Sequence, residues 1–223
     1  MPDSTTTYDF GTGPVPAHRL KNGAWVADSA RIHPTATIGP AVRIGPGAII
    51  GAGADIGPGT SIGGDAVIGK GVFIDAVADI WPRAFIDACA SIGVDASIGP
   101  AVRIGSDSSI DAEASIGKGA LIGTGVSIGR EAIIDECADI GPDAFISNGT
   151  YIGAYARIDK GADIGACARI GDGASIGVGA VIGEYASIDK CVTIAEFAVI
   201  ADRQHVSIDD IGASAPANKG FRL

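Results

Sequence analysis

The chain has 223 residues and a formal net charge of −10, and 47% of its residues are hydrophobic although only 5% are aromatic. An acidic chain repels nucleic-acid phosphates and anionic lipid head groups, so we expect neither nucleic acid nor a membrane as a partner. The polar start MPDSTTTYDF is unlike a secretory signal, and no apolar run reaches the roughly 18 residues of a membrane span, which favours a cytoplasmic location.

Residues 1–25 precede the regular part of the chain and are out of phase with it. A stack of repeats exposes unpaired strand edges at both of its ends, and such edges need to be covered. We therefore predict that residues 1–25 form an N-terminal cap, with an unstructured tail as the alternative.

The regular part spans residues 26–208 and has a period of six. Isoleucine occupies all 29 positions from Ile32 to Ile200 in steps of six, and Val26 and Val206 continue the series at its two ends. The residue after each isoleucine is Gly in 18 hexads and Asp in six, and the residue four positions after it is small. Because no insertion breaks this phase, we treat residues 26–208 as one repeat domain.

Each hexad predicts a short strand followed by a corner. The small residue and the isoleucine that follows it are two positions apart, so their side chains face the same way on an extended segment. The Gly or Asp indicates a bend that needs a positive φ or a side chain bonded to the local backbone. Three hexads close a triangular coil of 18 residues, and about ten such coils give a prism roughly 45–50 Å tall.

The residues after the repeat, 209–223, form the predicted C-terminal cap or tail. In the cap, Phe221 and Leu223 would cover the apolar interior of the last coil, whereas a tail would leave that interior open.

The hexad of Ile, then Gly or Asp, and then a small residue at the fifth position resembles that of the hexapeptide-repeat, left-handed β-helix superfamily, which includes bacterial acyltransferases. The stretch YDFGTGPVPAHRLKNGAWVADSA (8–30) is also similar to the opening of bacterial and phage hexapeptide-repeat proteins. The resemblance implies an all-β, left-handed parallel β-helix. The handedness comes from the resemblance alone, since parallel crossovers in general favour the right hand.

The resemblance also implies acyl transfer from acetyl-CoA or another acyl donor, with a histidine base at the interface between subunits of a trimer. Such a base needs a pKa near neutrality, which suits histidine. The three histidines are His18, His33 and His205, and none lies between the last two. His205 is the candidate base, with a plain surface residue as the alternative. Three histidines at opposite ends of a prism cannot converge on zinc, so we expect no metal.

The four cysteines are Cys89, Cys137, Cys167 and Cys191, and each lies three residues after a repeat isoleucine. Only Cys137 and Cys191 share a side of the prism, where three coils would separate them by about 14 Å, too far for a disulfide. We expect free thiols at a variable position, as in a reducing compartment.

The residue before each isoleucine points outward, and its identity therefore describes the surface. The first face, with Ile32 and Ile50, carries stacked apolar side chains, which favour a protein contact over isolated surface residues. The second face, with Ile38, carries two phenylalanines and a serine row that lacks the paired threonines of ice-binding β-helices. The third face, with Ile44, is the most polar. The predicted contact residues are Ile49, Val67, Phe85, Leu121, Phe73 and Phe145, with Trp81 at a corner.

The unbroken phase, without an extruded loop or a mid-coil histidine, favours a non-enzymatic structural or interaction module without a cofactor. We expect it to associate with itself through the first face, as a trimer or, alternatively, a dimer. The competing hypothesis is a hexapeptide acyltransferase with an unusual site, for which acetyl-CoA would be the donor.

Overall fold

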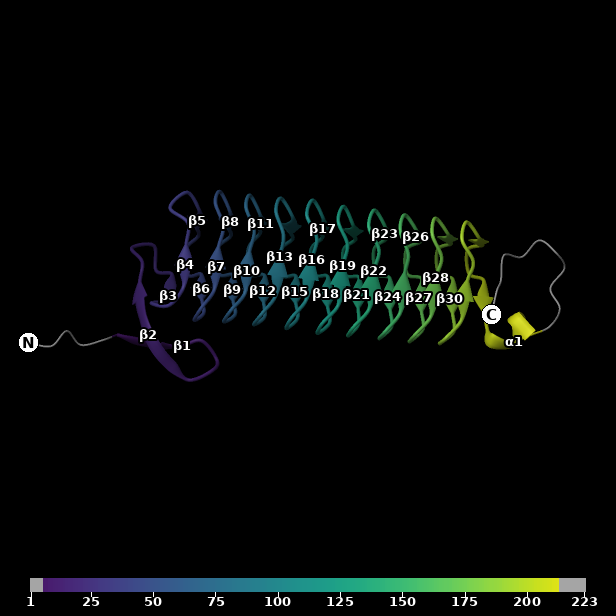
Figure 1. The fold of residues 1–223 in the computed structure, drawn as a ribbon, viewed down its shortest axis with the longest axis horizontal. Helices are drawn as coiled ribbons and strands as arrows, with labels where there is room; N and C mark the ends of the chain where they lie inside the picture. The colour runs from purple at the N-terminus through teal and green to yellow at the C-terminus, as the bar shows by residue number, and fades with distance from the viewer. Residues whose placement is uncertain (1–5, 213–223) are drawn as a thin grey trace, which may run out of the picture.

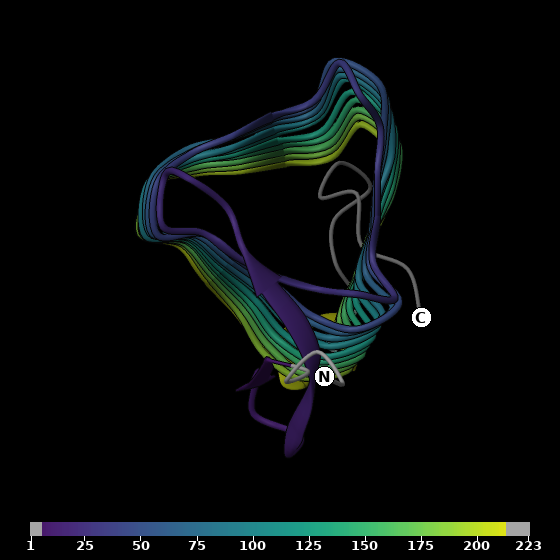
Figure 2. The same ribbon diagram turned by 90° about the vertical axis from the view of Figure 1, so that its left-hand side faces the viewer.

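The computed structural model describes residues 6–212 and shows an all-β, left-handed parallel β-helix, as the sequence predicts. The coils stack along one axis (Figure 1), and the view along that axis shows a triangular cross-section with the coils in register (Figure 2). The three sides of the triangle are three parallel sheets, and they correspond to the three faces predicted from residue spacing.

The first sheet has ten two-residue strands, which are β4 Arg31–Ile32, β7 Ile49–Ile50, β10 Val67–Ile68, β13 Phe85–Ile86, β16 Arg103–Ile104, β19 Leu121–Ile122, β22 Asp139–Ile140, β25 Arg157–Ile158, β28 Ser175–Ile176 and β31 Thr193–Ile194. The second sheet also has ten, which are β5 Thr37–Ile38, β8 Asp55–Ile56, β11 Phe73–Ile74, β14 Ser91–Ile92, β17 Ser109–Ile110, β20 Ser127–Ile128, β23 Phe145–Ile146, β26 Asp163–Ile164, β29 Val181–Ile182 and β32 Val199–Ile200.

The third sheet has 13 strands, because an N-terminal hairpin adds to it. Its strands are β1 Thr7–Asp9, β2 Pro14–Arg19, β3 Trp25–Ala27, β6 Arg43–Ile44, β9 Ser61–Ile62, β12 Asp79–Ile80, β15 Ser97–Ile98, β18 Ser115–Ile116, β21 Ile133–Ile134, β24 Tyr151–Ile152, β27 Arg169–Ile170, β30 Ser187–Ile188 and β33 His205–Val206.

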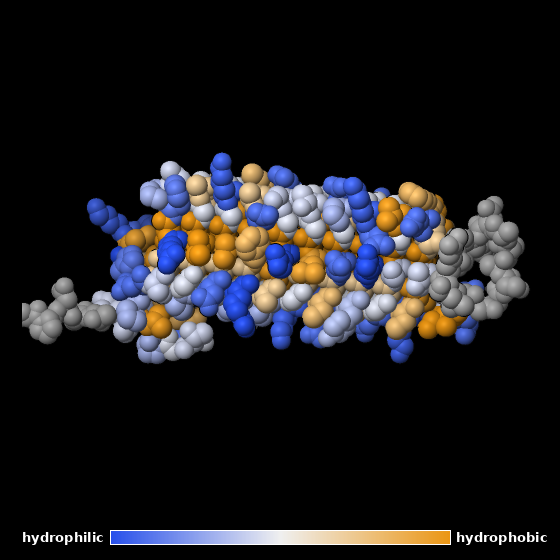
Figure 3. Space-filling view, in the orientation of Figure 1, coloured by the Kyte–Doolittle hydropathy of each residue, from blue (hydrophilic) through white to orange (hydrophobic). Residues whose placement is uncertain are grey.

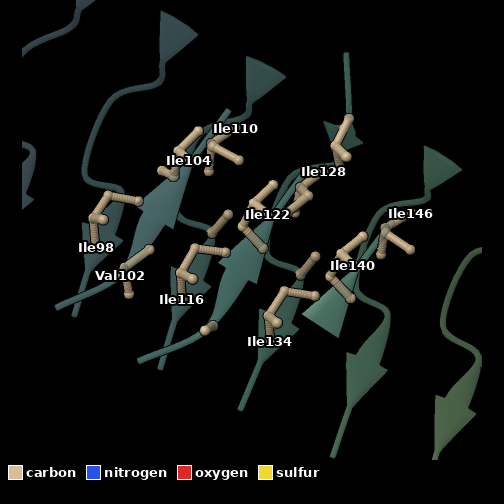
Figure 4. Packing of buried hydrophobic residues seen from close by; sticks show 14 of the residues in the cluster. Ile98, Val102, Ile104, Ile110, Ile116, Ile122, Ile128, Ile134, Ile140 and Ile146 are labelled. Atoms are coloured by element: carbon tan, nitrogen blue, oxygen red, sulfur yellow. The ribbon is translucent and has the colours of Figure 1, made fainter. Parts of the chain in front are cut away.

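The repeat isoleucines fill the interior of the prism. Every one from Ile44 to Ile200 is at most 4% exposed, and the small residues two positions earlier are buried beside them. Each isoleucine stacks on the one 18 residues away, as in the run from Ile98 to Ile146 (Figure 4). A fully buried isoleucine contributes roughly 1.5–3 kcal/mol, so this column supplies most of the apolar stabilisation.

Backbone hydrogen bonds tie each coil to both of its neighbours. Strand amides donate toward the C-terminal end, as from Ile49 N to Ala66 O at 2.8 Å. Corner amides donate in the opposite direction, as from Gly59 N to Pro40 O at 2.9 Å. Stacked coils thereby satisfy the backbone groups that close packing removes from water.

The corners differ from the prediction in one respect. From Ile38 onward the positive φ lies three residues after each repeat isoleucine, as at Cys89 (φ 59°) and Tyr155 (φ 58°), and not at the Gly or Asp directly after it. Glycine is instead favoured directly after the isoleucine because the backbones of neighbouring coils come close together there. A Cβ at Gly105 would lie 2.7 Å from Gly123 C and from Thr124 N of the next coil. The assignment of φ > 0 to this column was wrong for that reason.

Three of the six aspartates in the same column form the locally bonded corner that the sequence predicts. Asp75 Oδ1 accepts the amide hydrogen of Ala76 at 2.7 Å, and Asp87 and Asp135 make the same bond to the following residue. This bond between the side chain and its own turn is typical of Asp at bends.

Three buried hydroxyl side chains replace alanine or valine in the inner small column without leaving a polar atom unpaired. Thr60, Ser108 and Thr150 donate their hydroxyls to carbonyl oxygens of the next coil at 2.9, 2.8 and 3.0 Å. Because a buried hydroxyl without a partner is destabilising, these bonds explain why a polar residue is tolerated inside.

The N-terminal segment forms an antiparallel hairpin on the edge of the third sheet. β2 pairs with β3, and β1 pairs with β2. Tyr8 stacks on Trp25 with ring centroids 4.7 Å apart, and Phe10 contacts Tyr8 edge-on. Asn22 donates to Ile38 O at 2.7 Å, which covers part of the second sheet's edge. These strand pairings, ring contacts and the Asn22 hydrogen bond hold the hairpin against the prism.

At the other end, a short helix α1, Ile208–Gly212, follows β33. Asp210 accepts hydrogen bonds from the amide and the hydroxyl of Ser207, which fixes the start of this helix. The predicted plugs Phe221 and Leu223 lie outside the described residues.

The corner geometry predicts the cost of a methyl group. Gly105→Ala should lower the free energy of unfolding by about 3 kcal/mol, because the added Cβ lies too close to backbone atoms of the next coil, which must shift to admit it. Gly105→Asp should lose less, since Asp can bond to the next amide as Asp87 does. Gly53→Ala, at the equivalent corner three coils earlier, has open space and a positive φ, and should lose about 1 kcal/mol. Urea unfolding measures all three, and equal losses for the two alanine variants would contradict the close-approach account.

Candidate functional site

The first sheet carries a column of outward-facing apolar side chains, three of them exposed and one, Val67, half-buried, which we call the first-face column. It begins with Ile49, Val67 and Phe85 on consecutive strands in direct register, and Leu121 lies two strands further. Ile49 is 41% exposed, Phe85 37% and Leu121 45%. Figure 3 shows apolar residues gathered along the middle of this side of the prism, over β7 and β10. The sequence-predicted residues of this face thus form one continuous strip.

Arg103 lies within the first-face column between Phe85 and Leu121. Its guanidinium carbon is 5.6 Å from the centroid of the Phe85 ring, a cation–π contact that holds the arginine stem along the strip. A groove of about 290 Å³ runs beside these three residues, over Asp87 and the backbone of the glycine corners. Because the corner glycines have no side chains, the side chains of Phe85, Arg103 and Leu121 project beyond the surface of the sheet.

Charged residues bound the apolar strip at both ends. Arg31 precedes Ile49, and Asp139 follows Leu121. Both side chains are exposed, and neither forms an ion pair within residues 6–212. Beyond them Arg157 pairs with its own corner residue Asp159 at 2.7 Å. Asp139 also lies beside Arg157 in register, and their opposite charges attract each other. The strip therefore ends in a positive charge at Arg31 and a negative charge at Asp139 that Arg157 partly offsets.

Phe73 and Phe145 lie on the second sheet, a different side of the prism. They are 44% and 50% exposed, and the strands of Ser91, Ser109 and Ser127 separate them. The structure does not bring them together with each other, so their predicted contact role depends on a partner that spans two sides.

Trp81 lines a cleft beneath the N-terminal hairpin. The ring is 47% exposed, as expected for a corner that departs from glycine. The cleft has a volume of about 440 Å³, with Phe10 of the hairpin loop on one side and the third-sheet residues Arg43 and Asp79 on the other. Sequence spacing could not reveal this cleft, because the hairpin lies outside the repeat.

His205 contacts a carboxylate in the last coil. Its Nε2 lies 2.8 Å from Asp189 Oδ1, and this hydrogen bond together with the charge of Asp189 raises the pKa of His205 above its ordinary value. A polar groove of about 480 Å³ adjoins Asp189 and includes Tyr151, Arg169 and Asp172. The sequence analysis did not identify Asp189 as the partner of His205. The spacing gives its position, because Asp189 lies two residues after the position one coil before His205.

The remaining histidines and the cysteines lie apart from this pair. His18 contacts Asp28 in the hairpin region, and His33 contacts Thr35 at the first corner. The four cysteines are exposed free thiols on corners with positive φ. Within residues 6–212 no group of three or more His, Cys, Asp or Glu side chains is placed to hold a metal ion. Over the same residues, no helix has the length and apolar character needed to cross a bilayer.

Two sequence families match parts of the chain. One is described as the GMPPB C-terminal domain and matches residues 107–207, and the other as the hexapeptide repeat of succinyl-transferase and matches residues 41–76. Each match covers less than half of the chain. No curated protein matches the sequence.

Several solved structures are similar in fold. LpxA from Acinetobacter baumannii matches with a TM-score of 0.51 and 20% identity, over 79% of this chain and 70% of that one. The acetyltransferase domain of PglB from Neisseria gonorrhoeae has a TM-score of 0.46 and 22% identity, over 49% of this chain and 55% of that one. The chain therefore spans about half of the gonococcal structure. At such identities the likeness concerns the fold alone.

The contact between His205 and Asp189 predicts a measurable titration. In an NMR pH titration the His205 ring should keep its proton to a higher pH than a free histidine, whose pKa is about 6.5. Asp189→Asn should lower that pKa, whereas Asp163→Asn on the second sheet should leave it unchanged. Because the folded-state pKa is raised, the contact stabilises the fold in acid and loses this effect as the pH rises through it. An unchanged His205 pKa in Asp189→Asn would contradict the contact.

Proposed function

We propose, from the premise that the chain is a hexapeptide-repeat protein of the left-handed β-helix superfamily, that it is a structural module which associates with itself through the first face. The observation that carries this proposal is the first-face column of Ile49, Val67, Phe85 and Leu121. Four large apolar side chains aligned on one flat sheet leave an apolar strip in water, which a partner surface would cover.

The rigidity of the support favours the same proposal. Strand and corner amides bond every coil to its neighbours, so the outward side chains are held at fixed spacing along the axis. A rigid surface loses little conformational freedom on binding, which favours association between preformed faces. The polar third face, with side chains such as Ser61, Ser97 and Ser187, would remain in water.

The self-association is tested by placing a charge in the strip. Phe85→Asp should abolish association, because the new carboxylate would be buried between apolar surfaces. Ile133→Asp is the control, since Ile133 is an exposed apolar residue (47%, compared with 37% for Phe85) on the third sheet. Sedimentation velocity of the wild type and both variants over a concentration series gives the masses. A wild type that stays monomeric at every concentration, or an unchanged mass for Phe85→Asp, would refute the proposal.

A second candidate function is acyl transfer, and the contact between His205 and Asp189 favours it. A histidine oriented by a carboxylate can act as a general base toward an acceptor hydroxyl or amine. The polar groove beside Asp189 would receive the acceptor, and acetyl-CoA or another acyl donor would supply the acyl group. Both side chains are exposed, and a second subunit would be needed to close such a site.

Turnover measurements separate the two candidates. If acyl transfer is the function, acetyl-CoA should be consumed with an amine or sugar acceptor, and His205→Ala should lower kcat about 100-fold. His33→Ala, at the opposite end of the prism, should leave the rate unchanged. The structural proposal expects no turnover that depends on His205, and a His205-dependent rate would overturn it. Thiol release from acetyl-CoA provides the assay.

A further inference from the structure

We propose that two copies of the chain pair face to face in antiparallel orientation, with a twofold axis passing through Phe85. This inference rests on the proposed self-association and adds its geometry. In a twofold dimer each surface patch contacts the same patch of the partner, so the order of residues along the first-face column decides which side chains meet.

A twofold axis that lies in the interface and runs along the strands places the column on itself in reverse order. Around Phe85, this order puts Ile49 of one copy opposite Leu121 of the other, and Arg31 opposite Asp139. The central Phe85 meets its own counterpart. This arrangement gives Ile49, Phe85 and Leu121 apolar partners and joins the two end charges to each other, while Val67 faces Arg103. Symmetry repeats each pair that lies off the axis.

Other antiparallel registers lose these matches. A shift by one coil in one direction places Arg31 against Leu121 and Ile49 against Arg103. Four charges per dimer then face apolar side chains, compared with the two Arg103 that face Val67 in the Phe85-centred register. The opposite shift places Ile49 against Asp139, with the same consequence. A register with Phe85 at the centre is thus favoured by both the apolar contacts and the charges.

The charges near the axis are also balanced in this register. Asp87 lies at the corner beside Phe85, and its counterpart from the second copy would face it across the axis. Arg103, opposite Val67 of the partner, lies one coil to either side, so two guanidinium groups flank the two carboxylates. The stem of each Arg103 already lies along the Phe85 ring and can cover Val67 with its methylene groups.

The size of the contact predicts a weak dimer. From Arg31 to Asp139 there are six coil steps, or about 29 Å at a strand spacing of about 4.8 Å, and the flat part of a side is about 13 Å wide. Such a patch is of the order of 400 Å² per copy, or about 800 Å² in total, which is smaller than a standard specific interface and corresponds to a weak, transient contact. We therefore expect association in the micromolar range, which a concentration series resolves.

Charge exchange tests the register. Arg31→Asp and Asp139→Arg should each raise the dimer dissociation constant about tenfold, because two opposite-charge pairs become like-charge pairs. The double variant should return it to within about twofold of the wild type, since the exchanged charges face each other again. Sedimentation equilibrium at low salt measures all four proteins.

Cross-linking provides a second readout that does not depend on affinity. In a background where glycine replaces the four native cysteines, as in the preceding coil at each of those corners, Ile49→Cys with Leu121→Cys should give covalent dimers with a short bis-maleimide. Ile49→Cys alone should not, because the two copies of residue 49 lie about 19 Å apart along the axis. Parallel subunits would bring the two copies of residue 49 to the same height.

The outcomes distinguish the two proposals. A monomeric wild type overturns both. Three results overturn the antiparallel register: a trimeric mass, a double charge variant that dimerises as weakly as either single variant, or cross-linked dimers from Ile49→Cys alone. In each of these cases, loss of association in Phe85→Asp still supports self-association. Rescue by the double variant together with cross-linking only of the two-cysteine protein supports the inference.

Discussion

The constant stacking of 18-residue coils is the constraint on which the rest of this molecule depends. Each inward isoleucine packs on its equivalent one coil away, and each strand amide bonds to a carbonyl of the next coil. One inserted residue would reverse the side-chain facing of every later strand, because facing alternates with a period of two. The phase from Ile32 to Ile200 is consequently unbroken, and the interior is nearly the same at every level.

Because the buried residues are nearly the same in every coil, any function depends on the side chains that point outward. The buried columns contain almost the same two residue types throughout, whereas the outward position varies from Ile49 to Arg103 to Asp139 along one sheet. A fold that depends on the interior pattern can be shared at about 20% identity without showing what this chain does.

Sequence spacing alone was enough to predict the coils, the three sheets and the outward columns, because all of them follow from the period. It failed at the corners, since glycine can serve either a positive φ or a close approach, and only the neighbouring coil decides between them at Gly105. The partner of His205 required the stacking of coils, which brings Asp189 within 2.8 Å. The cleft at Trp81 depends on antiparallel strands that the repeat does not encode.

The two opposite directions of hydrogen bonding have a mechanical consequence. Strand amides such as Ile49 N bond toward one end of the prism, and corner amides such as Gly59 N bond toward the other. A tensile force along the axis would therefore load the whole ring of bonds between two coils together, and rupture at one level would leave the others intact. A bending force would have to stretch the hydrogen bonds between coils on one side of the triangle while the other two sides resist. The prism should therefore behave as a stiff rod that holds its ends at a fixed separation.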